Sequence, residues 1–177
     1  MPTYAAFLRG MNVGGHRITN ADLAQAMADL GFTELGTFLA SGNLHFVTHD
    51  ADPADLEVRI EDQLEQELGY AVPTLVRTAE QLAAVAAATP FPAKVVAASA
   101  GKLQVVFLRS APSAAKRRGL LALASDDDRL ALDGRELYWL PKAGISDAAI
   151  DLMNPSLYTG PATMRTMRTV ERLAARL

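Results

Sequence analysis

Two short apolar runs, each followed by an arginine, constrain the fold of this chain more than any other feature. Tyr4–Leu8 is a nearly continuous apolar run that ends at Arg9, and Leu103–Leu108 is a second one that ends at Arg109. Short apolar runs without polar interruption are typical of β-strands that are buried on both faces. Each predicted strand therefore needs other elements of the fold packed against both of its faces.

The residues that surround the first run predict a split βαβ unit. Good N-cap residues stand before each helical stretch, and glycines stand after it. Apolar residues recur every three or four positions in the helices and alternate in the hairpin strands. The order strand, helix, strand, strand, helix, strand is the pattern of ferredoxin-like folds. The predicted elements are a strand at 4–8, a helix from Thr19 or Asn20 to Gly31, hairpin strands at 37–40 and 44–47, a helix at 52–69 and a strand at 72–77.

The same order of elements begins again at the second run. We therefore expect an α+β fold made of duplicated ferredoxin-like (split βαβ) units, with antiparallel sheets and helices. The predicted domains are residues 1–78 and residues 79–177, with a boundary near residue 78 or within 89–101. The expected elements after 78 are a helix at 79–88, a polar stretch to Lys102, a strand at 103–108, a helix at 113–124, hairpin strands at 129–132 and 136–140, a short helix at 146–153 and a final amphipathic helix at 163–177.

The charges of the two halves are opposite. Residues 1–78 contain 4 Lys/Arg and 11 Asp/Glu, a sum of −7, and residues 79–177 contain 13 and 9, a sum of +4. Most of the acidity lies in 52–67, which we interpret as the solvated face of a helix. The alternative is that the second half contacts an anion or the first half. Helices cover one face of a ferredoxin-like sheet and leave the other face open. We expect the two halves to pack against each other there, or a neighbouring element to cover the open face. A ligand or a partner chain on the open face is the alternative.

The composition restricts the classes of protein to consider. The chain is 50% hydrophobic with a formal net charge of −3, and it has no cysteine. Disulfides and thiolate metal sites are thereby excluded. No apolar stretch is long enough to span a bilayer, and the N-terminus lacks the basic region of a signal peptide. We expect a soluble, cytoplasmic protein, a monomer or a homodimer, that does not bind membranes.

The charge and composition also argue against nucleic acid as a partner. The net charge is negative, whereas proteins that bind nucleic acid present a basic surface. Ferredoxin-like sheets that bind RNA expose aromatic side chains, and only 6% of the residues here are aromatic.

A glycine-rich segment between the first strand and the first helix predicts an anion site. Backbone N–H groups at a helix N-terminus have no partner within the helix, and arginine side chains add charge. The segment does not match the phosphate-loop or dinucleotide patterns, Asp22 in the first helical turn repels an anion, and a tight structural loop is the alternative. The predicted ligand residues are Arg9, Gly10, Asn12, Gly14, Gly15 and Arg17, with Ser41 and Asn43 from the hairpin turn and Arg165 and Arg168 from the C-terminal stretch.

The C-terminal arginines support this interpretation in one respect. Arg165 lies near the predicted start of the last helix, where the helix dipole disfavours a cation. A shared anion between Arg165 and the glycine-rich segment is one explanation. An acidic neighbour, or a solvated arginine face on an amphipathic helix, is the other.

The sequence predicts no metal site and leaves catalysis open. His45 and His49 are four residues apart, which on a strand separates them by about 13 Å. Ser41 is not in a nucleophile-elbow motif. His16 and His45 are the candidates for a titratable group, and no motif points to a particular cofactor. The hypotheses are binding of a phosphate-bearing or other anionic small molecule, an enzyme that acts on such a ligand, and a protein-interaction or dimerisation module.

Several segments resemble one known family. Tyr4–Gly15 is similar to the opening signature of the bacterial domain-of-unknown-function family 1697, and Ser41–Phe46 resembles its second signature. The resemblance implies a compact α+β fold with duplicated ferredoxin-like units and implies no particular activity. Further similar blocks follow in the same order at Pro90-Phe91, Val105–Leu108, Asp133–Tyr138 and Thr163–Val170.

The chain departs from the family pattern in two places. Met164, Thr166 and Met167 replace a threonine, an asparagine and a tryptophan of the C-terminal block, whereas Arg165 and Arg168 match it. A Ser-Lys pair of the family is Ser146-Asp147 here, so a ligand contact by that lysine does not carry over.

Overall fold

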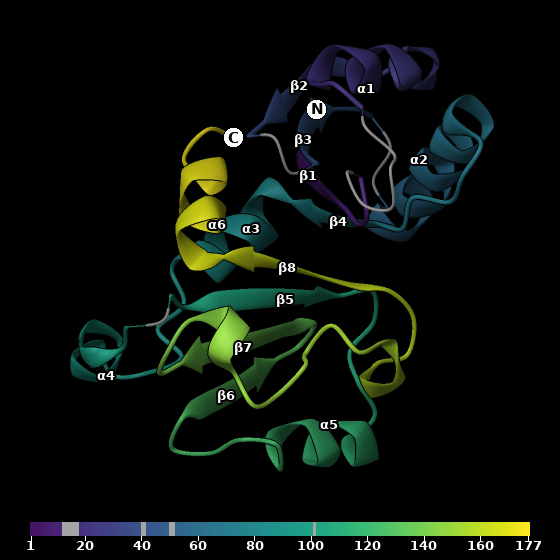
Figure 1. The fold of residues 1–177 in the computed structure, drawn as a ribbon. Coiled ribbons are helices and arrows are strands. Elements are labelled where there is room, and N and C mark those ends of the chain that lie inside the picture. The colour runs from purple at the N-terminus through teal and green to yellow at the C-terminus, as the bar shows by residue number, and fades with distance from the viewer. Residues whose placement is uncertain (12–17, 40–41, 50–51, 101) are drawn as a thin grey trace. The chain divides into compact units, whose positions relative to one another are not determined.

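The computed structural model describes residues 1–11, 18–39, 42–49, 52–100 and 102–177 (Figure 1). The chain forms two compact units. Unit 1 contains Met1–Ala83 together with Leu173–Leu177, and unit 2 contains Ala84–Arg172. The predicted domain boundary after residue 78 stays a prediction. Within the described residues, no helix has the length and apolar character needed to cross a membrane.

Unit 1 has the predicted ferredoxin-like topology. Its four-stranded antiparallel sheet has the order β2-β3-β1-β4, so that β3 lies between β1 and β2, the two strands that α1 connects. The elements are β1 (Thr3–Leu8), α1 (Asn20–Ala26), a 3₁₀ turn (Ala28–Leu30), β2 (Thr33–Phe38), β3 (Asn43–Val47), α2 (Pro53–Leu68), β4 (Thr74–Thr78) and α3 (Ala79–Ala86).

Local signals define the helices of unit 1. Thr19 caps α1 in a capping box with Asp22, whose N–H donates to the Thr19 hydroxyl at 3.1 Å. Asp52 caps α2, where the N–H of Ala54 donates to its carboxylate at 2.9 Å, and Gly69 ends the helix in the left-handed region. The predicted starts of both helices and the end of α2 at Gly69 are confirmed, whereas α1 ends at Ala26 and a 3₁₀ turn continues to Gly31.

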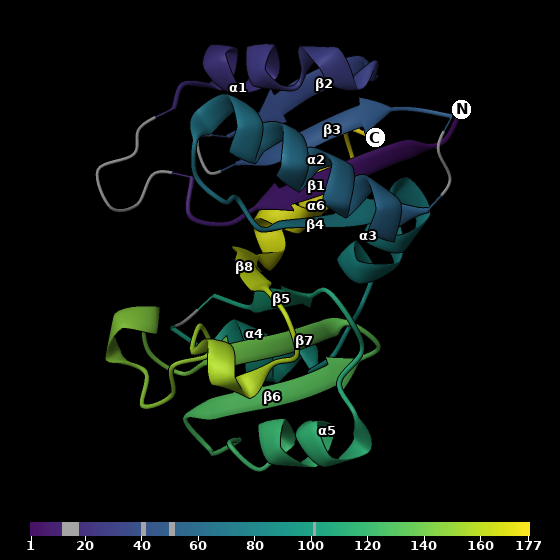
Figure 2. The ribbon, with the colours of Figure 1, turned by 90° about the vertical axis from the view of Figure 1, so that its right-hand side faces the viewer.

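Helices α1 and α2 of unit 1 cover one face of its sheet, as Figure 2 shows. The core between them is apolar and almost fully buried. Burying each large side chain stabilises the fold by roughly 1.5–3 kcal/mol. The core residues are Tyr4, Ala6 and Leu8 of β1, Leu44 and Phe46 of β3, Val76 of β4, Leu23 and Ala26 of α1 and Leu56, Ile60 and Leu64 of α2.

Two carboxylates of α2 bind the outer edge of β4. The N–H of Thr74 donates to Glu61 Oε1 at 2.7 Å, and the N–H of Val76 donates to Glu57 Oε1 at 2.9 Å. Glu57 is 2% exposed. These bonds occupy N–H groups that an edge strand otherwise offers to another strand. The interpretation of 52–67 as a solvated acidic face is therefore wrong for these two residues.

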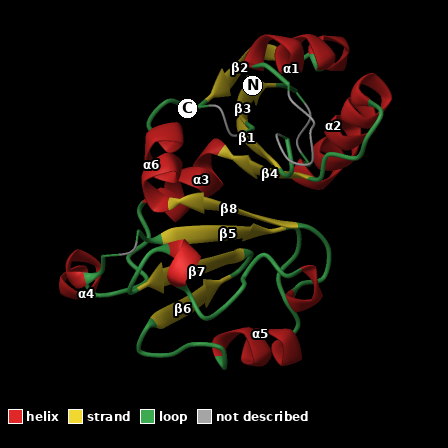
Figure 3. Ribbon diagram, in the orientation of Figure 1, coloured by secondary structure: helices red, strands yellow, loops and turns green. Residues whose placement is uncertain are grey.

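Unit 2 repeats the topology with a sheet of order β6-β7-β5-β8. The duplicated α+β fold is thereby confirmed. A loop with two 3₁₀ turns, Ile145–Asp147 and Pro155–Leu157, stands where unit 1 has α2 (Figure 3). The elements of unit 2 are α4 (Ala93–Ala98), β5 (Gln104–Leu108), α5 (Ala114–Leu121), β6 (Asp128–Asp133), β7 (Glu136–Pro141), β8 (Ala162–Thr166) and the start of α6 (Met167–Ala174).

The core of unit 2 includes a buried polar pair. Trp139 Nε1 donates to Asp128 Oδ1 at 2.8 Å, and the two residues are 1% and 2% exposed. Around them pack Val106 and Leu108 of β5, Leu120 of α5, Leu132 of β6, Leu137 of β7 and Leu152, Tyr158 and Ala162 from the C-terminal part of the unit. Both apolar runs of the sequence are buried, as predicted from their composition.

The duplication extends to individual residues. Phe7-Leu8-Arg9 and Phe107-Leu108-Arg109 end β1 and β5 in the same way. The N–H of Arg9 donates to the carbonyl of Pro73 at 2.9 Å, and that of Arg109 donates to the carbonyl of Pro161 at 3.3 Å. The sequence itself shows only a repeated order of elements, because few positions other than these keep the same residue.

The last strand of each unit also ends in the same way. An Arg-Thr pair, Arg77-Thr78 or Arg165-Thr166, precedes a helix in both units. Arg77 lies opposite Ala5 on β1, and Arg165 lies opposite Val105 on β5. The threonine hydroxyl accepts a bond from the helix backbone, from Gln81 N at 3.1 Å and from Thr169 N at 3.2 Å.

Three predicted elements of the second half are wrong. Residues 163–166 form most of strand β8 rather than the start of a helix, because they pair with β5 in register. Residues 146–153 contain only a 3₁₀ turn. The stretch 89–102, predicted to be irregular, contains α4. In unit 1, β2 begins at Thr33, earlier than the predicted 37.

Candidate functional site

Arg9 lies at the end of β1, at the start of the glycine-rich segment. Its backbone is fixed by the bond to Pro73, and the residue is half-buried. Within the part of the chain that the structure describes, its guanidinium has no hydrogen bond or ion pair. Gly10 follows with φ of 75°, a conformation that favours glycine. Arg9 and Gly10 are thus two predicted ligand residues side by side at the end of a buried strand.

The hairpin between β2 and β3 packs against this end of β1. Gly42 has φ of 71°, its carbonyl accepts from Leu8 N at 2.8 Å, and an added Cβ would lie 3.0 Å from Met11 Cγ. Asn43 is fully buried and donates its side-chain N–H to the carbonyl of Phe38 at 2.9 Å. This bond gives Asn43 a structural role in closing the hairpin.

The other predicted residues of this loop lie outside the described residues. They are Asn12, Gly14, Gly15 and Arg17, together with His16, and Ser41 of the hairpin turn.

Two cations near the equivalent end of β5 in unit 2 are bonded to backbone carbonyls. Arg135 Nη1 donates to the carbonyl of Arg109 at 3.2 Å. Lys116 Nζ donates to the carbonyls of Ser156 at 3.0 Å and Tyr158 at 3.3 Å. Arg135 and Lys116 thus hold the loops of unit 2, and they differ in this respect from Arg9.

Arg165 does not begin a helix, which corrects the electrostatic argument made from the sequence. It lies within β8, where its Nη1 donates to Thr163 Oγ1 at 2.9 Å and to the carbonyl of Met164 at 2.8 Å. Burial lowers the pKa of Arg165 to about 10. Arg168 is exposed in the first turn of α6. Arg9 belongs to unit 1 and Arg165 to unit 2, and the common site predicted for them stays a prediction.

His45 packs its ring over a glycine. It lies opposite Gly36 in the β2–β3 pair, and its buried Nδ1 has no hydrogen-bond partner among the described residues. Burial lowers the pKa of His45, the positive charge of Arg176 lowers it further, and Glu34 opposes both. Among the described residues no group of His, Asp or Glu is arranged to hold a metal ion.

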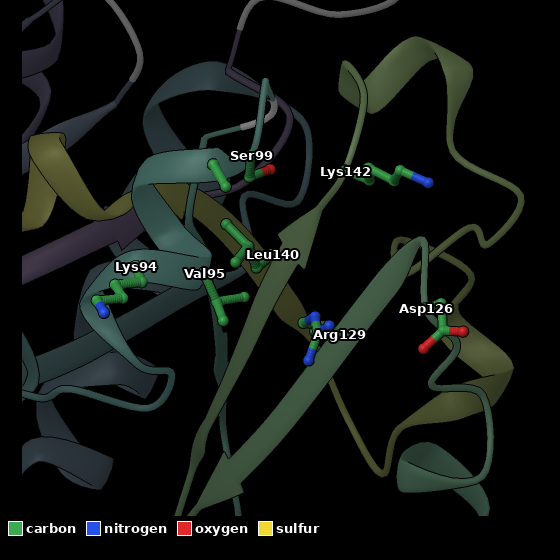
Figure 4. Close-up of a pocket in the computed structure, with 8 residues that line it drawn as sticks. Lys94, Val95, Ser99, Asp126, Arg129, Leu140 and Lys142 are labelled. Atoms are coloured by element: carbon green, nitrogen blue, oxygen red, sulfur yellow. The ribbon is translucent and has the colours of Figure 1, made fainter.

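Unit 2 contains a cavity that the sequence does not predict (Figure 4). It has a volume of about 420 Å³ and lies between α4, β6 and the end of β7. Its walls are apolar at Val95, Ala98 and Leu140, and Arg129 of β6 borders it. The remaining lining residues are Lys94, Ser99, Asp126 and Lys142.

The comparisons with known proteins agree with the fold. The model of the family described as protein of unknown function (DUF1697) matches residues 1–138. The chain belongs to this family. The resemblance stated from the sequence is thereby confirmed. The matched range of the DUF1697 family ends within β7, so that Arg165 and Arg168 lie beyond it.

One solved structure has the same fold over almost the whole chain. It is the conserved bacterial protein SP0830 from Streptococcus pneumoniae, with a TM-score of 0.67 and 20% sequence identity. The similarity covers 98% of this chain and 97% of that chain. No curated protein sequence matches the chain.

The cavity of this DUF1697 protein was missed for a physical reason. Val95 and Ala98 stand in an alanine-rich, polar stretch without a helical stop signal, so the sequence does not predict α4. Arg129 alternates with apolar residues in β6. This alternation is the one local sign in the sequence that its side chain projects from the face of the sheet opposite α5. The position of α4 near the Arg129 side chain follows from the tertiary fold and not from the local sequence.

Proposed function

We propose that this protein binds a small anionic ligand, such as a phosphate-bearing molecule, at the end of β1. The observation that supports the proposal is the state of Arg9. Arg9 is half-buried, and its guanidinium has no hydrogen bond or ion pair within the described residues, although a charged group that loses contact with water is costly without a partner.

The comparison between the two units strengthens the argument. The duplication gives both units an arginine at the same position, after a buried Phe-Leu pair. In unit 2 the neighbouring cations, Arg135 and Lys116, satisfy loop carbonyls. Arg9 has no such structural bond to the described residues, and Gly10 beside it leaves the backbone open to a ligand. An anion would complete the hydrogen bonding of Arg9.

Thermal unfolding with a panel of anions tests this function. Inorganic phosphate, a nucleoside monophosphate and a sugar phosphate are added to the wild-type protein and to Arg9→Ala. A ligand at about 100 times its Kd stabilises the folded state by about 2.7 kcal/mol. We expect at least one anion to raise the melting temperature of the wild type and to lose this effect in Arg9→Ala.

The matched control is Arg117→Ala, which removes an exposed arginine of α5 in unit 2. This variant should respond to the anion like the wild type. Arg168→Ala, added to the same panel, tests the predicted contribution of the C-terminal block. If no anion stabilises the wild type, or if Arg9→Ala responds as the wild type does, the protein has no anion site at Arg9.

A further inference from the structure

We propose that the cavity of unit 2 is a second binding site, which takes an organic anion with an apolar body, such as an aromatic carboxylate, sulfonate or phosphate ester. The site is independent of Arg9, because all of its lining residues belong to unit 2. The shape, the charge and the rigidity of the cavity each support this assignment.

The walls of the cavity select an apolar body. Val95 of α4 and Leu140 of β7 lie close together in the cavity (Figure 4), and Ala98 of α4 also lines it. Leu140 is 2% exposed, whereas Val95 is half-buried. A volume of about 420 Å³ is within the range of sites for small organic ligands. An inorganic ion alone would leave these apolar surfaces in contact with water.

The charges around the apolar walls select an anion. Lys94, Arg129 and Lys142 border the cavity, against one carboxylate, that of Asp126. Lys142 forms a solvent-exposed ion pair with Asp127, at 2.8 Å. The side chains of Lys94 and Arg129 have no hydrogen bond or ion pair to any residue that the structure describes. In Figure 4 the Arg129 guanidinium lies between the side chains of α4 and Asp126, and Lys94 stands at the opposite end.

Hydrogen bonds hold the upper rim of the cavity in place. Ser99 Oγ donates to the carbonyl of Pro141 at 2.5 Å, and the N–H of Ala100 donates to the carbonyl of Lys142 at 3.1 Å. The N–H of Lys142 in turn donates to the carbonyl of Asp127 at 2.7 Å. The end of α4 is thus attached to the end of β7, and the cavity exists before a ligand arrives. Preformed sites avoid the entropic cost of ordering their walls on binding.

The position of Arg129 on β6 gives the ligand its orientation. Arg129 lies opposite Leu140 in the β6–β7 pair, so that its side chain and that of Leu140 project from the same face of the sheet. An acid group bonded to the guanidinium would therefore place the attached apolar body over Leu140, against α4.

Two matched fluorescent probes test the site in the full-length protein. Anilinonaphthalene sulfonate has an apolar aromatic body and one negative charge, and N-phenyl-naphthylamine has the same aromatic body without the charge. We expect the sulfonate to bind with one site per chain and to shift the amide NMR signals of 94–99, 129 and 140–142. Arg129→Gln should weaken its binding about tenfold or more, since it removes a charge-assisted hydrogen bond. The neutral probe should bind more weakly and show no dependence on residue 129.

Control variants separate this site from general effects. Arg117→Gln, at an exposed position of α5, should bind the sulfonate like the wild type, and the amide spectrum of Arg129→Gln should keep the dispersion of a folded protein. The proposal is overturned if the wild type shows no shift at these amides, if Arg129→Gln binds the sulfonate as tightly as the wild type, or if the neutral probe binds equally well. Failure of the anion panel at Arg9 leaves this result unaffected, so the two proposals are distinguishable.

Discussion

The imidazole ring of His45 occupies the space that a side chain at Gly36 would need. The two residues lie directly opposite each other on β3 and β2, and a Cβ built on Gly36 would overlap the ring. A glycine at this position therefore serves a packing purpose that its backbone conformation does not require, since its φ is not in the left-handed region.

Gly36→Ala should destabilise unit 1 by about 1–3 kcal/mol, because the ring has to move or the strands have to separate. Without the clash, the same change in a strand would be neutral or stabilising. Urea unfolding followed by circular dichroism measures the difference. In the double variant Gly36→Ala with His45→Ala, the added methyl group should lower the free energy of unfolding only slightly relative to His45→Ala alone. If Gly36→Ala destabilises both backgrounds equally, the packing explanation is contradicted.

The pH dependence of stability should contain a contribution from His45. Burial and Arg176 lower the pKa of His45 from its ordinary 6.5. The unfolded chain then binds a proton at a higher pH than the folded one, so stability decreases as pH falls through 6.5 and levels off below the folded pKa. His45→Gln should reduce the loss of stability between about pH 7.5 and about pH 5.5, a range in which histidine titrates. His49→Gln, at an exposed position after β3, is the control and should keep the wild-type slope.

Glu57 should protect the outer edge of β4. Glu57→Ala removes the acceptor of the Val76 N–H, and we expect a cost of about 1–3 kcal/mol for the unsatisfied buried group. Glu57→Gln keeps an acceptor oxygen and should cost less. Hydrogen exchange of the Val76 amide is the direct measurement, faster in the alanine variant than in the wild type. Glu65→Ala, exposed on the same helix, should leave that exchange rate unchanged.

The buried bond between Asp128 and Trp139 should stabilise unit 2. Asp128→Ala leaves the indole N–H without its acceptor and should destabilise by about 1–3 kcal/mol. Asp128→Asn keeps a carbonyl acceptor and should lose less. Trp139 is the chain's single tryptophan, so its fluorescence during urea unfolding reports on this unit. Asp126→Ala, an exposed neighbour, should unfold like the wild type, and equal stability of all three variants would contradict a role for the bond.

The part of the fold that was predicted correctly depends on signals between near neighbours in the chain. The cap at Asp52 and the stop at Gly69 belong to one helix and are satisfied within it. The apolar runs 4–8 and 103–108 define strands because their composition alone demands burial. The residues after 162 were predicted as a helix because Met164, Met167 and Val170 also fit a helical stripe. Pairing with β5, far away in the chain, decides that 162–166 is a strand.

Local patterns of burial and capping in the sequence are enough to predict the duplicated α+β architecture and the starts of α1, α2, α3 and α5, and two signature segments are enough to indicate the family. Which charged side chains have bonding partners became clear from the folded structure. The Glu57 carboxylate accepts from a strand edge and the Arg135 guanidinium donates to a loop carbonyl, whereas the side chains of Arg9 and Arg129 bond no described residue. The physical reason is that a charged side chain takes its role from the partners that folding brings to it, and those partners lie on other elements of the fold.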